Sequence, residues 1–593
     1  MKSNRILRAG LVARTLVALV ASSYAFCLFA LDTERPDPRT RTFLPPARVV
    51  WTSGDAVYGN RSAVKDAESL LKPRFGQIPE ERWRADCGCT MENNGEPASV
   101  LLDFGRELHG GIQIGGMCPR GMKMRVRFGE SVGEAMSEIG QKYAGNDHAI
   151  RDGVHDIPFM GIVEIGNTGF RFVRLDLVTT GKVNLECVRA VSLMRQMPRL
   201  GEFKCSDERL NRIWETAVRT VHLCCQDFLW DGIKRDRLVW LGDMHPEARA
   251  ILSVFGAAEV LPDSIDYAIA TTPADGWMNA MPNYTLWFLR VVREWYRYTG
   301  DAAWIRKRGE YLRATVMHVL ENVRGDKAAY AGSSEARMFL DWPTQHNKPA
   351  VLAGTRALLA LSLNDAAELM DAAGDAELAA KCREEAARTR MERPDPAGAK
   401  SAAALLALGG LRDAKDMFRE VLGRNGHDGV SAFYGYYMLE AMSAAGENSR
   451  ALDTIRDYWG GMLDMGATSF WEDFNLTWTN NVTRLDELPV QGKKDIHGDF
   501  GEFCYRGFRH SLCHGWSAGP AAWCIAHVLG LEATGVGGSA VRVTPFLGDL
   551  EWAEGALPTA KGVVRVRHEK RPDGSIDTKI DAPPGVEIID GRR

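Results

Sequence analysis

The pattern of hydrophobic and polar residues changes twice along the 593-residue chain. From about residue 45 to 200, short segments such as SVLLDF and KMRVRFGES alternate apolar and polar positions, with Gly, Pro and Asn between them. Alternation with a period of two is typical of strands that bury one face. We therefore predict an antiparallel, jelly-roll-like β-sandwich over residues 31–204.

From about residue 205 to 530 the period lengthens to that of helices, as in SDERLNRIWETAVRTVHL and YTLWFLRVVREWYRYTG. Most of these segments begin near Ser, Thr or Asp and end near Gly, which are the residues expected at helix caps. About a dozen such segments in consecutive hairpins predict an (α/α)6 toroidal helical barrel over residues 205–535. No sequence repeat is regular enough to indicate a solenoid.

Strand-like alternation returns after Pro545, in segments such as GVVRVRHEK. It predicts a small C-terminal β-sandwich over residues 536–593. The predicted fold class is therefore mixed and mainly α, with the helical barrel between two β-sandwiches.

The first thirty residues have the composition of a secretory signal. Basic residues between Lys2 and Arg14 precede the apolar segment TLVALVASSYAFCLFA, which is shorter than the ~20 residues that a spanning helix needs. The pattern Ser23-Tyr24-Ala25 fits a signal-peptidase site better than Phe29-Ala30 does. We predict that residues 1–30 are removed on export to the periplasm or beyond, and that the mature chain has no integral membrane contact.

Composition excludes some functions. The chain has 73 Lys and Arg residues against 77 Asp and Glu, so it lacks the basic excess that binds nucleic acid. Its twelve cysteines form no CxxC pair and no zinc spacing, and we predict no metal and no cofactor. One disulfide in the DCGCT loop remains an alternative to buried free thiols. Neither the oligomeric state nor a calcium requirement follows from the sequence.

Residues 230–243, WDGIKRDRLVWLGD, mix acids, bases and tryptophans. Asp231, Asp236 and Asp243 are spaced five and seven apart with Trp240 between them, which does not place the acids on one face of a helix. Two glycines favour a loop. Acids beside aromatic rings at the rim of a barrel suit a polar substrate with apolar faces; the alternative is a buried salt-bridge cluster.

Three later segments repeat this combination. Glu472 follows Trp471 in GATSFWEDF, Asp341 precedes Trp342 in MFLDWPTQHN, and His514 precedes a tryptophan in HSLCHGWSAG. Each segment lies between predicted helices. Although one tryptophan beside an acid is more often part of the core, four such segments favour a shared pocket.

The order of these segments resembles glycoside hydrolase family 78, the bacterial α-L-rhamnosidases, over nearly all of the chain after residue 30. The strand LLDFGRELHGGIQIG is similar to the family's sandwich motif, and the segments around residues 340–342, 467–472 and 511–514 are similar to its GDW, ATT-x-WE and S-x-N-H motifs. The acid-rich segment resembles D-C-P-Q-R-D-E-R-L-G-W-T-G-D but is one residue shorter. Alignment on RLVWLGD places Asp236 at the family's general-acid glutamate, whereas alignment on KRD deletes that position. We prefer the first because five further residues then match.

The resemblance implies a general acid at Asp236 and a water-activating base at Glu472. Cleavage of a glycosidic bond needs such a pair, one carboxyl protonated and one ionised. Aspartate is one methylene shorter than glutamate, so the sugar must lie closer, and the flanking Arg235 and Arg237 would favour the ionised form if they faced it.

The remaining site residues are expected to bind the sugar. Their predicted roles are hydrogen bonding by Asp231, Asp243, Asp341 and His514, and packing against the C6 methyl group and the ring by Trp240, Trp342 and Trp471. The interval between Glu472 and His514 is longer than in the family. Within it, Lys493, Lys494 and His497 are candidates to bind a uronate; the alternative is a solvated surface loop.

The first hypothesis is therefore an exported, exo-acting α-L-rhamnosidase that removes terminal L-rhamnose from a polysaccharide or glycoside with inversion. Its partner is a rhamnose-containing glycan. Two alternatives remain: a glycosidase of the same fold that acts on a different terminal sugar, and a catalytically inactive carbohydrate-binding relative.

Overall fold

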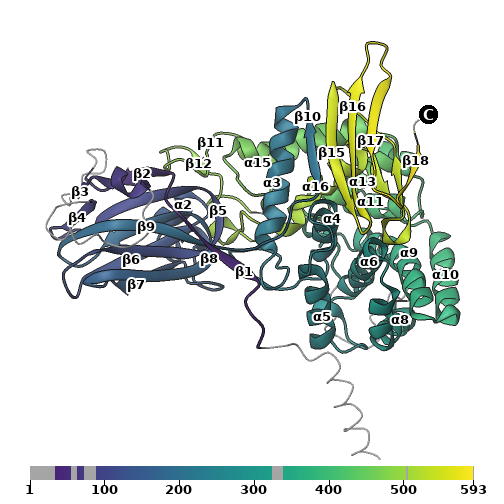
Figure 1. The fold of residues 1–593 in the computed structure, drawn as a ribbon, viewed down its shortest axis with the longest axis horizontal. Coiled ribbons are helices and arrows are strands. Elements are labelled where there is room, and N and C mark those ends of the chain that lie inside the picture. Colours follow the sequence, from purple (N-terminus) through teal and green to yellow (C-terminus); the bar gives the residue numbers. More distant parts are fainter. Residues whose placement is uncertain (1–33, 55–62, 73–87, 324–337, 502–504, 592–593) are drawn as a thin grey trace, which may run out of the picture.

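The computed structural model describes residues 34–54, 63–72, 88–323, 338–501 and 505–591. A β domain formed by the first third of the chain lies beside the helices and the C-terminal strands (Figure 1). No helix in the described ranges is long and apolar enough to cross a membrane. The predicted signal segment and Cys87 of the DCGCT loop lie outside these ranges.

In its described residues, the N-terminal β domain contains nine antiparallel strands that hydrogen-bond into one connected sheet rather than two separate sheets. The strands are β1 (Arg39–Leu44), β2 (Arg48–Thr52), β3 (Ala63–Lys65), β4 (Cys89–Asn93), β5 (Ala98–Met117), β6 (Lys123–Gly129), β7 (Asp152–Asp156), β8 (Met160–Leu177) and β9 (Gly181–Arg195). The long strand β5 pairs with β2 near its start and with β9 near its end, and its register against β8 shifts between Asp103 and Leu108. Irregularities of this kind bend a strand. The two ends of β5 can therefore pair with different strands, β2 and β9, and still pack around one core.

The helical part begins at residue 208. Its helices are α3 (Glu208–Cys224), α4 (Met244–Val254), α5 (Val260–Thr271), α6 (Pro282–Thr299), α7 (Ala302–Lys307), α8 (Gly309–Asn322), α9 (Lys348–Ala373), α10 (Ala376–Arg390), α11 (Lys400–Leu408), α12 (Ala414–Met417), α13 (Gly435–Ala444), α14 (Asn448–Thr454), α15 (Gly460–Asp464) and α16 (Gly519–Trp523). The predicted caps are present: Asp207 accepts two N–H groups of the first turn of α3, and Gly300 and Gly374 end α6 and α9 with positive φ.

Six of these helices contact one another in a closed cycle. Among the described residues, α4 packs on α6, α6 on α9, α9 on α11, α11 on α13, α13 on α16, and α16 again on α4. Their side chains belong to one continuous hydrophobic core. Apolar residues lie on most faces of α9 and α11, which is expected of helices packed on several sides.

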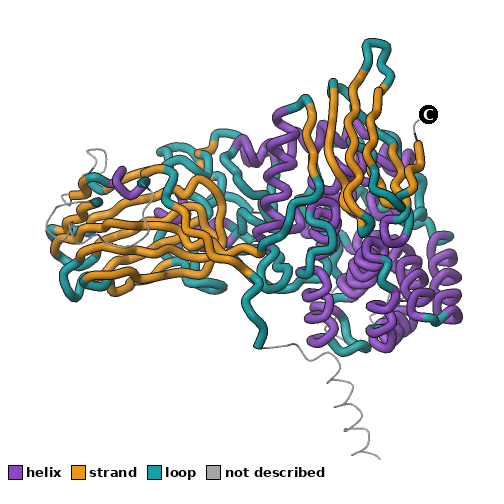
Figure 2. Tube along the Cα trace, viewed as in Figure 1, coloured by secondary structure: helices purple, strands orange, loops and turns teal. Residues whose placement is uncertain are grey.

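The C-terminal strands form two small sheets, which pack beside the helices (Figure 2). The larger sheet contains β10 (Glu202–Cys205), β15 (Trp552–Thr559), β16 (Gly562–Lys570) and β17 (Ile576–Asp581), and the smaller contains β13 (Leu531–Ala533), β14 (Ala540–Val543) and β18 (Glu587–Asp590). The boundaries differ from those expected at residues 205 and 536. β10 pairs with β15 rather than with the N-terminal strands, a choice of partner that local alternation does not encode.

The nine cysteines in the described ranges are all buried. They behave as small apolar side chains, as predicted for most of them.

Candidate active site

The acid-rich segment is an irregular connection between α3 and α4, as the two glycines predicted. It lies beside the segment that leads into α16, because Gly232 forms a β-bridge with His514 and the Gly515 N–H donates to the Asp231 carbonyl at 2.7 Å. The first third of the helical part and its end therefore meet at one place.

A cavity of about 380 Å³ opens at this place. Seven of the nine predicted site residues line it: Asp231, Asp236, Trp240, Asp243, Trp342, Glu472 and His514. The sequence analysis did not assign its other lining residues, which are Asn279, Ala280, Met281, Tyr284, Phe339, Tyr505 and Trp516. Tyr284 lies in the first turn of α6, where a helical pattern indicates packing and nothing local distinguishes a cavity-facing ring.

Asp341 and Trp471 are not among the cavity-lining residues, which corrects their predicted contact with the sugar. The Asp341 carboxylate accepts the Trp342 N–H at 2.9 Å and the Ser431 hydroxyl at 2.8 Å, so it holds the turn that presents Trp342. Burial raises the pKa of Asp341 to about 7. Trp471 is buried edge-on against Phe474, with ring centroids 5.4 Å apart. Both residues support the cavity wall from behind.

The predicted uronate-binding group is also corrected. Lys493 and Lys494 are exposed and do not line the cavity. His497 is fully buried, with its ring nitrogens 2.8 Å from the Ser131 hydroxyl and 2.9 Å from the His510 carbonyl oxygen. The long interval reaches the cavity through Tyr505 instead, whose ring packs on the Arg235 guanidinium at 3.5 Å.

Arg235 links the two candidate catalytic carboxylates. Its Nη1 lies 2.9 Å from Asp236 Oδ2, and its Nη2 donates to Glu472 Oε1. Because both carboxylates bind one planar guanidinium, the contacted oxygens lie within about 8 Å of one another. Arg237, by contrast, turns away and donates to the backbone carbonyls of Asn167 and His148.

Glu472 is held in the ionised form. Burial alone would raise its pKa, but the Arg235 guanidinium outweighs burial and holds the pKa of Glu472 well below its usual value. The Ser511 N–H also donates to Glu472 Oε2 at 3.2 Å. A carboxylate whose pKa is this low is a weak base. It would accept a proton from water more readily if a bound molecule separated it from the positive charge of Arg235.

Asp231 and Asp243 have the opposite character. Both are buried, and burial raises the pKa of each well above its usual value; the neighbouring Asp243 adds to the effect at Asp231. Asp243 Oδ1 accepts the Tyr284 hydroxyl at 2.9 Å, and the His514 Nε2 lies 3.6 Å from Asp231 and 3.9 Å from Asp243. Burial lowers the pKa of His514 to about 3, so this imidazole is neutral at pH 7. The group therefore presents hydrogen-bonding side chains to the cavity.

Glu130, Glu134 and His497 are the one group of side chains in the described ranges that brings three potential metal ligands close together. The Lys234 ammonium lies among them, 3.1 Å from Glu130 and 3.2 Å from Glu134. It also donates to the carbonyls of Phe508 and His510 at 2.8 Å. Because the Lys234 ammonium already lies among these carboxylates, the group is a buried ion-pair cluster. It connects the N-terminal β domain to the segment that carries Ser511.

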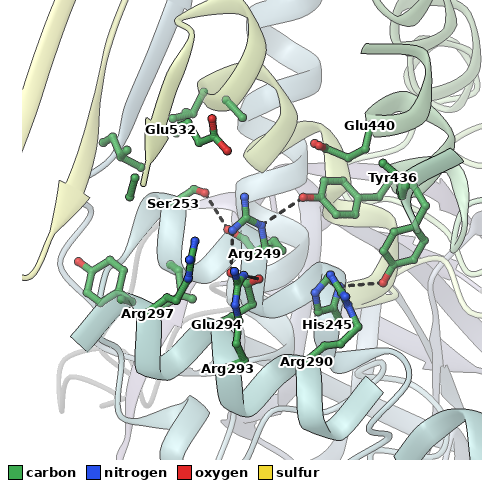
Figure 3. Close-up of a pocket in the computed structure, with 18 of the residues that line it drawn as sticks. His245, Arg249, Ser253, Arg290, Arg293, Glu294, Arg297, Tyr436, Glu440 and Glu532 are labelled. Carbon is green, nitrogen blue, oxygen red and sulfur yellow. Dashed lines mark hydrogen bonds and ion pairs between the residues drawn. The ribbon is translucent and has the colours of Figure 1, made fainter. Parts of the chain in front are cut away.

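A second cavity, of about 320 Å³, is lined in part by residues of α4 and α6 (Figure 3). Its arginines are paired within the wall: Arg249 binds Glu294, Arg293 binds both Glu294 and Glu368, and Arg297 binds Glu368. Arg249 also donates to the Tyr436 hydroxyl. The charges in this wall balance one another, whereas the first cavity presents acids and aromatic rings to its interior.

Helices α4 and α6 run from the first cavity to the second. Asp243 and Met281 directly precede α4 and α6 and line the first cavity, while Ser253 and Tyr298, near the ends of the same helices, line the second.

Residues 198–392 match the model of the bacterial α-L-rhamnosidase six-hairpin glycosidase domain. This segment is therefore similar to the six-hairpin domain of that family. The resemblance found in the sequence is thereby confirmed for the part of the rhamnosidase domain that contains Asp231, Asp236, Asp243 and Asp341. Glu472 and His514 lie beyond the matched residues.

Solved rhamnosidases share the fold. A family 78 rhamnosidase of Bacillus sp. GL1 superposes with a TM-score of 0.71 at 22% identity, over 89% of this chain and 55% of that one. A Klebsiella oxytoca rhamnosidase described with rhamnose bound gives 0.61 at 19%, over 82% and 95%. A Streptomyces avermitilis α-L-rhamnosidase complexed with L-rhamnose gives 0.64 at 16%, over 84% and 50%. The chain thus spans about half the length of the Bacillus and Streptomyces proteins, and no curated protein matches its sequence.

Proposed function

We propose that this protein is an exported, exo-acting α-L-rhamnosidase that removes terminal L-rhamnose from a polysaccharide or glycoside with inversion. The observation that carries the proposal is the shared position of Asp236 and Glu472, which line one cavity and bind one guanidinium. The family match of residues 198–392 supports the reaction class. Export rests on the signal-like composition of residues 1–30.

Glu472 serves as the base in this mechanism. The incoming sugar and water separate its carboxylate from Arg235, and Glu472 then accepts a proton from the water as the water oxygen bonds to the anomeric carbon. The Ser511 N–H keeps the carboxylate oriented throughout. Attack from the side opposite the leaving group gives inversion.

Asp236 serves as the acid. Glu472 is the carboxylate that Arg235 holds ionised, which leaves the acid role to Asp236 on the other side of the same guanidinium. Asp236 gives a proton to the departing oxygen as the glycosidic bond breaks.

The shape of the cavity supports exo action. Tyr284 lines the first cavity, whereas Trp287, almost one turn later on α6, lines the second and stacks on Tyr437 at 4.7 Å. These rings close the bottom of a blind pocket within what we propose is an (α/α)6 barrel. A blind pocket admits the end of a glycan and not its middle. Trp240 and Trp342 offer apolar faces for the methyl group of a 6-deoxy sugar.

A panel of p-nitrophenyl glycosides tests the proposal. We expect release of p-nitrophenol from the α-L-rhamnoside and little from the other sugars. Proton NMR of the same reaction in its first minutes should show the β-anomer of rhamnose before mutarotation. Release of a different sugar would reassign the substrate, and an α-anomer formed first would exclude the inverting mechanism.

Arg235→Gln tests the electrostatic part of this mechanism. Loss of the cation should raise the pKa of Glu472, so that the acidic limb of the kcat/KM profile moves upward by about one pH unit or more. The variant should therefore lose most of its activity at low pH. Arg237→Gln is the matched control, since Arg237 binds carbonyls and not carboxylates. Superimposable profiles for wild type and Arg235→Gln would show that Glu472 is not the titrating base.

A further inference from the structure

The N-terminal β domain contributes a side chain to the site. His148 belongs to the connection between β6 and β7, and its Nδ1 lies 3.1 Å from Asp236 Oδ1. Asp236 Oδ2 is held by Arg235 at 2.9 Å. Each oxygen of the candidate acid therefore has its own partner, one from the helical part and one from the β domain.

His148 Nε2 lies 3.2 Å from the Arg509 guanidinium and 3.5 Å from Asp147 Oδ2. Because a guanidinium only donates, we assign Nε2 as the acceptor and Nδ1 as the N–H donor. Nδ1 then donates to Asp236 Oδ1. The Asp236 N–H also points toward Nδ1, but at 3.4 Å it lies outside the usual range of a hydrogen bond. Arg509 is itself fixed by Asp147 at 2.7 Å.

The backbone at this point is strained. Asp236 and Arg237 have φ values of 55° and 57°, a left-handed conformation that side-chain-bearing residues rarely adopt. Such a turn persists only where its surroundings hold it. Here the Arg237 guanidinium donates to the His148 carbonyl at 2.8 Å and to the Asn167 carbonyl at 2.9 Å, so the β domain fixes the turn from outside the helical ring.

We propose that His148 is a positioning residue for the reaction: its Nδ1–H holds Asp236 Oδ1 and aims the acid at the leaving oxygen. The inference rests on the proposed glycosidase function. It gives the N-terminal β domain a part in catalysis, and it compensates for the short side chain of Asp236, which must be placed accurately because proton transfer is steep in distance.

Paired substitutions of His148 separate positioning from folding. In His148→Asn the side-chain amide N–H replaces Nδ1–H at nearly the same place, whereas His148→Ala removes it. We expect His148→Ala to lose about 10- to 100-fold in kcat on a rhamnoside with a poor leaving group, with a small change in KM, and His148→Asn to keep most of the activity. An activated aryl rhamnoside should be affected much less. His155→Ala on β7 is the matched control, since His155 makes no contact with Asp236 in the described part of the chain.

Equal losses of kcat in His148→Ala and His148→Asn would overturn the inference.

Crystal structures of the two variants test the inference without activity. We expect the Asp236 carboxylate to leave its position in His148→Ala and to keep it in His148→Asn. An unmoved carboxylate in His148→Ala would refute positioning by His148 even if the wild-type protein cleaves no rhamnoside. Wild-type inactivity on the glycoside panel would instead refute the proposed function.

Discussion

Glu472→Gln should lower kcat by about 10²–10⁴-fold while the protein remains folded. Glutamine keeps the size and one acceptor oxygen of glutamate but takes no proton from water. The substitution removes the negative charge that balances Arg235. Because loss of one partner of a buried ion pair lowers stability, the Tm must be measured together with kcat. The reaction to follow is hydrolysis of an aryl α-L-rhamnoside under saturating conditions.

Glu487→Gln is the control for this substitution. Glu487 lies later in the same segment, and its side chain is 53% exposed. We expect wild-type kcat and Tm from this variant. If Glu472→Gln retained wild-type turnover, Glu472 would have no part in the reaction, and the position of the carboxylate in the cavity would have to serve binding alone.

Asp236→Asn should have an effect that depends on the leaving group. An alkoxide must be protonated as it departs, so we expect a loss of about 10²–10⁴-fold on a rhamnose-containing disaccharide. p-Nitrophenolate departs without protonation, and the loss on its rhamnoside should be about tenfold or less. The measurement is kcat/KM for a series of aryl rhamnosides of increasing leaving-group pKa, with the disaccharide at the end.

The wild-type enzyme provides the comparison for Asp236→Asn, because its rate should depend only weakly on the leaving group. A uniform loss over the whole series would assign Asp236 to sugar binding. The carboxyl from which the departing oxygen takes its proton would then have to be sought at Asp231 or Asp243, whose pKa values burial raises well above the usual value.

Arg235 contacts two carboxylates whose surroundings differ. Glu472 is almost fully buried, while the Asp236 side chain is 18% exposed and also faces His148. A cation stabilises a buried carboxylate more than a solvated one. In the proposed mechanism this difference in surroundings, rather than in residue type, separates the base from the acid.

The sequence by itself determined the kinds of elements and the candidate chemistry. Alternation predicted antiparallel strands at both ends, the helical period and its caps predicted the helices between them, and the spacing of acids and glycines predicted the loop before α4. Seven of nine site residues line one cavity because each lies in a loop before or between helices, where the ring brings loops together. These features are local, and local patterns record which face of an element is buried.

Only the tertiary structure decided which side chains meet. Asp341 and Trp471 have the same sequence setting as Trp342 and Glu472, yet packing places them behind the cavity wall. Arg235 meets Glu472 across 237 positions, and His148 meets Asp236 across 88. The pairing of β10 with β15 is equally distant in sequence. Such partners depend on how whole elements pack together. The local sequence pattern determines which way a side chain points, but not which distant side chain it contacts.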